Sequence, residues 1–245
     1  MPLSTDMNWP QGLLNIFNVS CNQNTQLKSR YYGPYDRLFN YAVIEGSFNL
    51  YLTLQFAPDE TSLHDSVDFV VFMVVLNQEQ KPVLIVEIKD DKWVNKPDKR
   101  LRVDAQMCQQ FNQMLPNCAI PHLYGLSLLG TSLCVYHGDK ATCIVTPHFI
   151  NCPDMNQTLP PDFLEGHWDL DILSLDGLKK MQEIVAYIKA EVAKVWGGDL
   201  SEWPQSFYLI MRHFSYSCHK WSILSAIFSN LLSMNEAIFK FHLLL

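Results

Sequence analysis

The chain has 245 residues, of which 48% are hydrophobic, and this composition predicts a folded globular protein with a packed core. Its formal net charge of -7 and pI near 5.5 argue against a general high-affinity nucleic-acid binder, because phosphate contacts need Lys and Arg.

The seven cysteines form no C-x-x-C pair and no compact cluster with His, so we expect no structural zinc. Their odd number, and the apolar surroundings of Cys108 and Cys134, fit buried thiols in a reducing compartment. The N-terminal sequence has neither a basic start nor an apolar run. We therefore expect no signal peptide and an intracellular location, cytoplasmic or nuclear.

The first elements are an arm, a helix and a strand. Residues 1–34 are rich in Asn, Gln, Ser and Pro, and we expect them to form a peripheral N-terminal arm. From Pro34 to Gly46, apolar residues recur at helical spacing, which predicts a helix. Residues 48–56 then alternate aromatic, Leu and Thr side chains, which predicts a strand.

Two apolar stretches, 67–76 and 83–88, form the centre of the predicted fold. Each is apolar on both alternating faces except for one acid, Asp68 in the first and Glu87 in the second, which is typical of central strands. The short polar segment 77–82 between them predicts an antiparallel hairpin.

Three charged side chains share one face of this hairpin. Side chains alternate along a strand, so Glu87 and Lys89 lie on the same face. Three registers are open, which place Glu87, Lys89 or Asp91 opposite Asp68, and all of them put Asp68 on that face. Two carboxylates so close repel each other unless a cation lies between them. The pattern therefore predicts a metal site.

The later elements complete a mixed sheet. An amphipathic helix is predicted from Pro97 to Leu115. Strands are predicted at 123–129 and 133–136, with a third short one at 143–145. The order helix, three strands, helix, strand predicts an α/β (α+β) fold in which helices flank a mixed sheet.

The C-terminal part contains a loop, a helix and an apolar tail. We expect a wrapped loop at 147–175, followed by a helix that Asp176 caps and that ends at Gly197-Gly198. Residues 199–245 are apolar with few charges, but no run reaches the ~18 residues needed to span a bilayer. They are either an appended helical tail, with protein contact or self-association through 221–245, or a product of how the coding sequence was translated.

The motif that Asp68 forms with Glu87-Ile88-Lys89, across 18 intervening residues, resembles the D…(D/E)xK signature of the PD-(D/E)XK nuclease superfamily. The resemblance covers residues 35–137 and implies a restriction-endonuclease-like core within a domain at 35–198, to which C-terminal helices are added. Val67 replaces the proline of the family's name. The segments SVDFVVF, VLIVEIKDD and LYGLSLLG are also similar to segments of proteins from mushroom-forming fungi that carry no established activity.

The resemblance implies roles for the central residues. Asp68, Glu87 and the main-chain carbonyl of Ile88 would bind Mg²⁺ or Mn²⁺ through oxygen. Lys89 would steady the attacking water or the charge that grows on the phosphorus centre. Asp90 and Asp91 would be spare carboxylates at the rim of the site, where they could place a second metal or repel the nucleic-acid backbone.

Two helical positions are also implied. Family members place an acidic residue on the first helix, and Glu45 matches by position. Some nucleases of the family place a glutamine on the helix after the hairpin, for which Gln106 is the candidate and Gln110 the alternative. The competing interpretation is that all three side chains are simply exposed.

Together these residues imply metal-dependent hydrolysis of phosphodiester bonds in DNA or RNA. One alternative is a catalytically inactive interaction protein in which Asp68, Glu87 and Lys89 form a buried ion triad. Another is a regulatory module that works through its C-terminal helix. The chain has no Walker P-loop, dinucleotide fingerprint, HExxH or G-x-S-x-G motif, so other common hydrolase and redox classes lack support.

Overall fold

The computed structural model describes residues 2–23, 27–44, 49–56, 67–74, 80–150 and 158–195. The chain divides into two compact units, Met1–Gly198 and Asp199–Leu245. The predicted apolar tail forms the second unit and lies outside the described residues.

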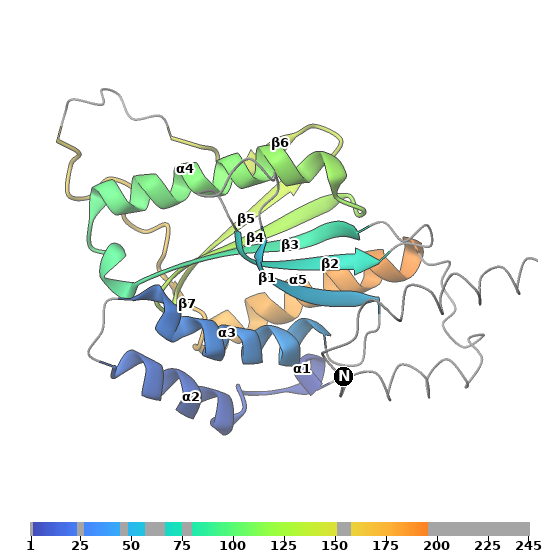
Figure 1. Cartoon of the computed structure of the whole chain (residues 1–245), viewed down its shortest axis with the longest axis horizontal. Helices are drawn as coiled ribbons and strands as arrows, with labels where there is room; N and C mark the ends of the chain where they lie inside the picture. Colours follow the sequence, from blue (N-terminus) through green and yellow to red (C-terminus); the bar gives the residue numbers. More distant parts are fainter. Residues whose placement is uncertain are drawn as a thin grey trace, which may run out of the picture. The chain divides into compact units, whose positions relative to one another are not determined.

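A seven-stranded sheet forms the centre of the first unit (Figure 1). The strands are β1 (Leu50–Phe56), β2 (Val67–Val74), β3 (Gln80–Lys89), β4 (His122–Leu129), β5 (Ser132–Asp139), β6 (Ile144–Thr146) and β7 (Leu170–Asp171). The first six lie in sequence order, and β7 pairs with β5. Strands β3 and β4 are parallel, whereas every other pair is antiparallel. The expected mixed α/β class is confirmed.

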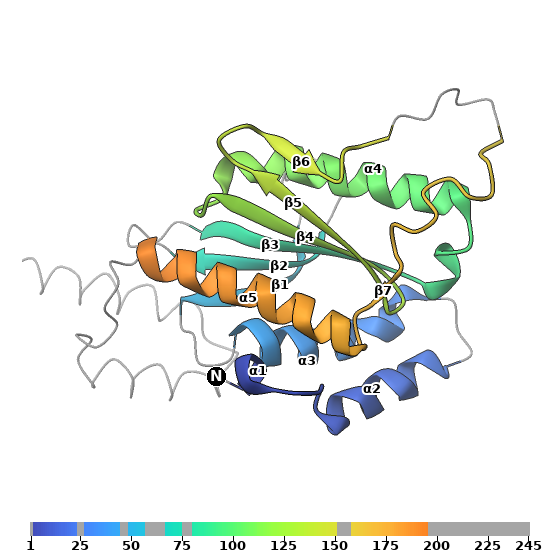
Figure 2. The same cartoon turned by 180° about the vertical axis from the view of Figure 1, so that it is seen from behind.

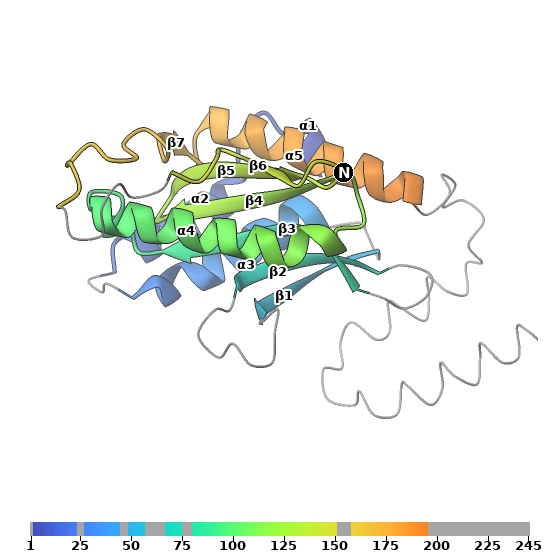
Figure 3. The ribbon, with the colours of Figure 1, turned by 90° about the horizontal axis from the view of Figure 1, so that it is seen from above.

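Helices cover both faces of the sheet. They are α1 (Pro2–Thr5), α2 (Gln11–Cys21), α3 (Tyr32–Phe39), α4 (Pro97–Met114) and α5 (Leu175–Val195), with short helical turns η1 (Lys28–Tyr31), η2 (Asn40–Ile44), η3 (Asp91–Trp93) and η4 (Leu115–Asn117). Helix α4 lies on one face, and α3 and α5 lie on the other (Figures 2 and 3). None of the helices in the described ranges is long and apolar enough to cross a membrane.

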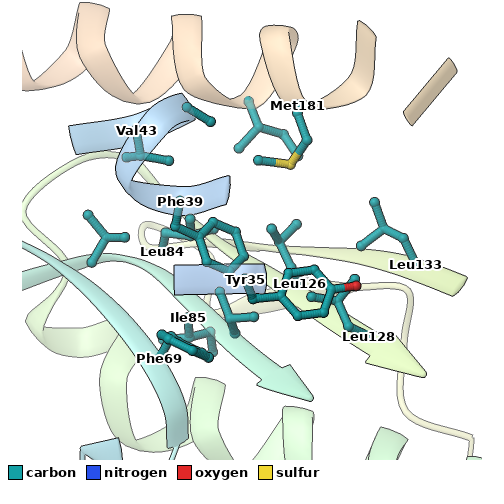
Figure 4. Close-up of a cluster of buried hydrophobic side chains, with 14 of the residues drawn as sticks. Tyr35, Phe39, Val43, Phe69, Leu84, Ile85, Leu126, Leu128, Leu133 and Met181 are labelled. Carbon is teal, nitrogen blue, oxygen red and sulfur yellow. The ribbon is translucent and has the colours of Figure 1, made fainter. Parts of the chain in front are cut away.

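The face under α3 and α5 holds a large apolar cluster. Tyr35 and Phe39 of α3 and Met181 of α5 pack over the strands, where Leu84 and Leu126 point toward them (Figure 4). Because both faces are covered, β3 is buried along most of its length. Any charged side chain on β3 must therefore find its partners inside the protein.

The N-terminal segment belongs to the packed unit, so the expectation of a peripheral arm at 1–34 is corrected. Leu13 and Phe17 lie four residues apart on α2 and are buried in the core. Trp9 is also buried, and its Nε1 donates to the carbonyl of Ile172 at 2.8 Å. This anchoring places the following turn, η1, beside the central strands.

The segment before α5 crosses the face covered by α4. Trp168 is buried there, and its Nε1 donates to Ser127 Oγ at 3.1 Å. Ser127 is the register partner of Glu87 in the parallel pair β3–β4. At the start of α5, Ser174 Oγ accepts from the Gly177 N–H at 3.0 Å, so Ser174 and not Asp176 caps the helix.

Candidate active site

The sheet register brings Asp68 and Glu87 together. The last ladder pair between β2 and β3 is Phe69 with Val86, and one further step puts Asp68 opposite Glu87. Beyond this pair, the Asp68 side chain and not a backbone carbonyl accepts the strand N–H: its Oδ2 accepts from the Ile88 N–H at 2.8 Å. Of the three registers that the sequence left open, the structure has the one with the two carboxylates directly opposed.

Glu87 lies between two donors at the buried end of β3. Its Oε1 accepts from Lys89 Nζ at 2.5 Å, and its Oε2 accepts from Gln110 Nε2 at 2.8 Å. The side chain has no exposed surface. Burial, together with the negative charge of Asp68, raises the pKa of Glu87 to about 7, although Lys89 and Gln110 act in the opposite direction. The site therefore holds more negative potential than its buried amine neutralises.

Lys28 belongs to the site, although the sequence did not predict it. Its Nζ donates to Asp68 Oδ1 at 2.7 Å and lies 3.9 Å from Glu87 Oε1. The Tyr32 hydroxyl donates to the same Asp68 oxygen at 2.6 Å. Burial alone would lower the pKa of Lys28, but the contact with Asp68 outweighs it and raises that pKa above its ordinary value. One amine thus faces both carboxylates.

A local signal for Lys28 was present in the sequence. Lys28 and Tyr32 are four residues apart, the spacing that puts two side chains on one side of a helical segment. The composition of residues 1–34 favoured a peripheral arm, and an arm of that kind predicts no side chain in the site.

The two helical candidates have different outcomes. On α4, Gln110 and not Gln106 is the glutamine that donates to Glu87. Gln110 is buried, whereas Gln106, one turn earlier, is half-buried. Glu45 lies outside the described residues, so its predicted role stays a prediction.

The acidic rim is held by an arginine. Arg30 Nη2 donates to Asp90 Oδ2 at 3.1 Å and to Asp91 Oδ1 at 2.7 Å. Asp90 Oδ1 also accepts from the Lys92 N–H at 3.1 Å. The expectation of two spare carboxylates is therefore wrong, because η1 supplies a guanidinium to this pair as well as an amine to Asp68.

The donor set fits a hard divalent cation, on one condition. Asp68 and Glu87 offer carboxylate oxygens, the ligand type that Mg²⁺ and Mn²⁺ prefer. Among the described residues, no group of three or more His, Cys, Asp and Glu could hold a metal. Every oxygen of the two carboxylates accepts a hydrogen bond within the protein. Asp68 Oδ1 accepts two hydrogen bonds, from Lys28 and Tyr32, so a cation at this oxygen would have to displace one of these two donors.

The main-chain carbonyl of Ile88 was the third predicted metal ligand, and its role stays a prediction. Ile88 contributes its N–H to Asp68, and its side chain is buried on the opposite face of the sheet.

No protein-family model, curated protein or solved structure matches this chain. What the cluster can do follows from its own geometry: two carboxylates face one partly exposed amine, that of Lys28, and the more buried amine of Lys89 lies beside Glu87.

Proposed function

We propose that this chain is a metal-dependent nuclease of the PD-(D/E)XK type that hydrolyses phosphodiester bonds in nucleic acid. The observation that carries the proposal is the placement of Asp68 and Glu87 within 4.0 Å of a single amine, with Lys89 bonded to Glu87. Burying such a cluster is expensive, and well-packed apolar residues would serve stability as well or better. A buried carboxylate whose pKa is raised, as that of Glu87 is, is typical of functional sites.

The order of elements supports the same proposal. Helix α3 is followed by strands β1 to β3, then by α4 and β4, which is the order implied by the restriction-endonuclease-like fold. The proposed site lies where β3 ends, and α4 supplies Gln110 to it from above the sheet. A core of this type would place the carboxylates at the ends of the central strands, where a nucleic-acid strand can approach.

Each side chain has a role in the proposed reaction. Asp68 and Glu87 would hold the Mg²⁺ ion, which when bound stabilises negative charge on the phosphate and lowers the pKa of a coordinated water. The Ile88 N–H and the Tyr32 hydroxyl fix the orientation of Asp68. Lys89 would place its amine beside the phosphate and stabilise the charge that grows there.

One observation favours the alternative, a catalytically inactive nuclease-like interaction or regulatory protein. Lys28 and Lys89 balance the charges of Asp68 and Glu87 without any ion. A chain that had lost metal chemistry would keep this neutral cluster as a structural device. The two functions differ in whether a divalent cation binds at all.

Thermal unfolding with and without metal tests the proposal. Millimolar Mg²⁺ or Mn²⁺ should raise the Tm of the wild type but not that of Asp68→Ala or Glu87→Ala, because a ligand stabilises only the state that binds it. Lys89→Ala should still bind metal, yet cut single- and double-stranded DNA and RNA at least ~100-fold more slowly. Lys92→Ala is the matched lysine control. Equal Tm shifts in all variants would contradict the metal site.

A further inference from the structure

The Lys28 ammonium group lies where a cation shared by the two carboxylates would be. It is 2.7 Å from Asp68 Oδ1 and 3.9 Å from Glu87 Oε1. A Mg²⁺ ion would contact those oxygens at ~2.0–2.1 Å. The ion and the ammonium group would then compete for the same oxygens and repel each other at close range. They cannot occupy this position together.

Lys28 and Lys89 differ in how firmly they are held. The Lys28 side chain is 37% exposed, whereas that of Lys89 is 11% exposed. The Lys89 amine lies against Glu87 and 5.6 Å from the centre of the Trp93 ring. Lys28 can therefore move into water on its flexible stem when another cation takes its place at Asp68, whereas Lys89 cannot leave without removing the buried amine that pairs with Glu87.

Asp68 keeps its orientation when Lys28 leaves. Its Oδ2 still accepts from the Ile88 N–H at 2.8 Å, and its Oδ1 still accepts from the Tyr32 hydroxyl at 2.6 Å. These two donors are neutral, so they fix the carboxylate without cancelling its charge. The site that remains after Lys28 moves is ordered and carries uncompensated negative charge.

We propose that Lys28 is an exchangeable internal cation, which balances the metal-free site and is displaced from Asp68 when a divalent cation binds. The proposal rests on the metal-binding function proposed above. Lys28, which lies on the turn η1, would then stabilise the metal-free site and lower its apparent affinity for metal. When metal binds, Lys28 would be released from Asp68. A purely structural Lys28 would instead stay bonded to Asp68.

Mn²⁺ binding to the full chain tests the exchange. Mn²⁺ would be titrated into wild type, Lys28→Met and Lys28→Gln, with free Mn²⁺ followed by electron paramagnetic resonance. Removal of the competing ammonium should lower the Kd for Mn²⁺ at least tenfold in both variants. Lys92→Met removes the same charge outside the cluster and should change the Kd less than threefold.

Melting in EDTA supplies a second readout. Without metal, Lys28→Met should melt below wild type, because its two carboxylates are no longer balanced, and saturating Mn²⁺ should raise its Tm by more than it raises that of wild type. If wild type binds Mn²⁺ and the Lys28 variants bind it equally or more weakly, the exchange is wrong while the metal site stands. If none of the proteins binds Mn²⁺, the proposed function and the exchange both fail.

Discussion

The two ends of the β3–β4 region each hold a carboxylate beside a basic side chain, but in opposite surroundings. At the proposed active site, Glu87 is bonded to Lys89 at the buried end of β3. At the other end of β4, Asp139 lies 3.2 Å from His122, whose Nδ1 is 3.0 Å from the Tyr187 hydroxyl. The two carboxylates differ in their access to water, because the side chain of Glu87 is fully buried and that of Asp139 is 35% exposed.

This difference reverses the pKa shifts. Burial is the main cause that raises the pKa of Glu87 to about 7. Hydrogen bonds, first of all from the Thr142 N–H, lower the pKa of Asp139, whose side chain is 35% exposed. A partly exposed contact of this kind is an ordinary surface feature. The buried cluster needs several dedicated donors, and this requirement supports the proposal that it is a functional site.

Loss of one carboxylate at each end should give the largest contrast. Asp68→Ala leaves the buried Ile88 N–H without its acceptor. It should lower the free energy of unfolding by about 1–3 kcal/mol, since the partly exposed Lys28 can recover hydration. Asp139→Ala, at the hydrated end, should give a much smaller change. Urea unfolding of both variants measures this, and equal losses would remove the distinction between the two ends.

The pH dependence of stability should also differ between the ends. The folded-state pKa of Glu87 lies above the ordinary value of 4.5, so its stabilising contribution is complete below about 4.5 and is lost as the pH rises through about 7. The metal-free wild type should therefore lose on the order of 2 kcal/mol between pH 5 and 8 relative to Glu87→Gln.

Asp139 should show the opposite sign. Its folded-state pKa lies below the ordinary value of 3.8, so its contribution is present above that pH and is lost as the pH falls further. Unfolding in EDTA at a series of pH values, for wild type, Glu87→Gln and Asp139→Asn, separates the pH range in which Glu87 acts from the range in which Asp139 acts. A Glu87→Gln profile parallel to that of wild type from pH 5 to 8 would show that Glu87 is not perturbed.

The smallest expected effect concerns the support of Glu87 by α4. Gln110→Ala removes the bond to Glu87 Oε2 and should weaken Mn²⁺ binding about tenfold, because groups that orient a metal ligand contribute at that level. Gln106→Ala, one turn away, is the matched control and should leave the Kd for Mn²⁺ nearly unchanged. The reverse ranking would mean that α4 presents a different residue to the bound metal than it does in this structure.

The sequence predicted the centre of the fold well, because burial on both faces of a strand leaves a clear local pattern. Asp68 and Glu87 stood out as the single charges in two apolar stretches, and alternation put Lys89 beside them. Lys28 could not be found in the same way. Lys28 lies between α2 and α3, and these helices pack through the contact of Phe17 with Tyr35, which the polar composition of residues 1–34 did not indicate.

The choice between the two glutamines also depended on packing. Gln106 and Gln110 lie on the same side of α4, so helical periodicity does not separate them. The position of α4 along the sheet is set partly at Gly125, where an added Cβ would lie 2.6 Å from Phe111 Cε2. This close approach of helix and strand brings Gln110 to Glu87, and no local sequence pattern records it.

The central claim is that Asp68 and Glu87 share a divalent cation. The most direct measurement is a crystal structure of the full chain grown with Mn²⁺, in which anomalous scattering locates the ion. We predict one ion that contacts carboxylate oxygens of both residues, with Lys28 turned away from Asp68. A map in which the Lys28 ammonium still bonds Asp68, and no anomalous peak lies between the two carboxylates at saturating Mn²⁺, would contradict the account.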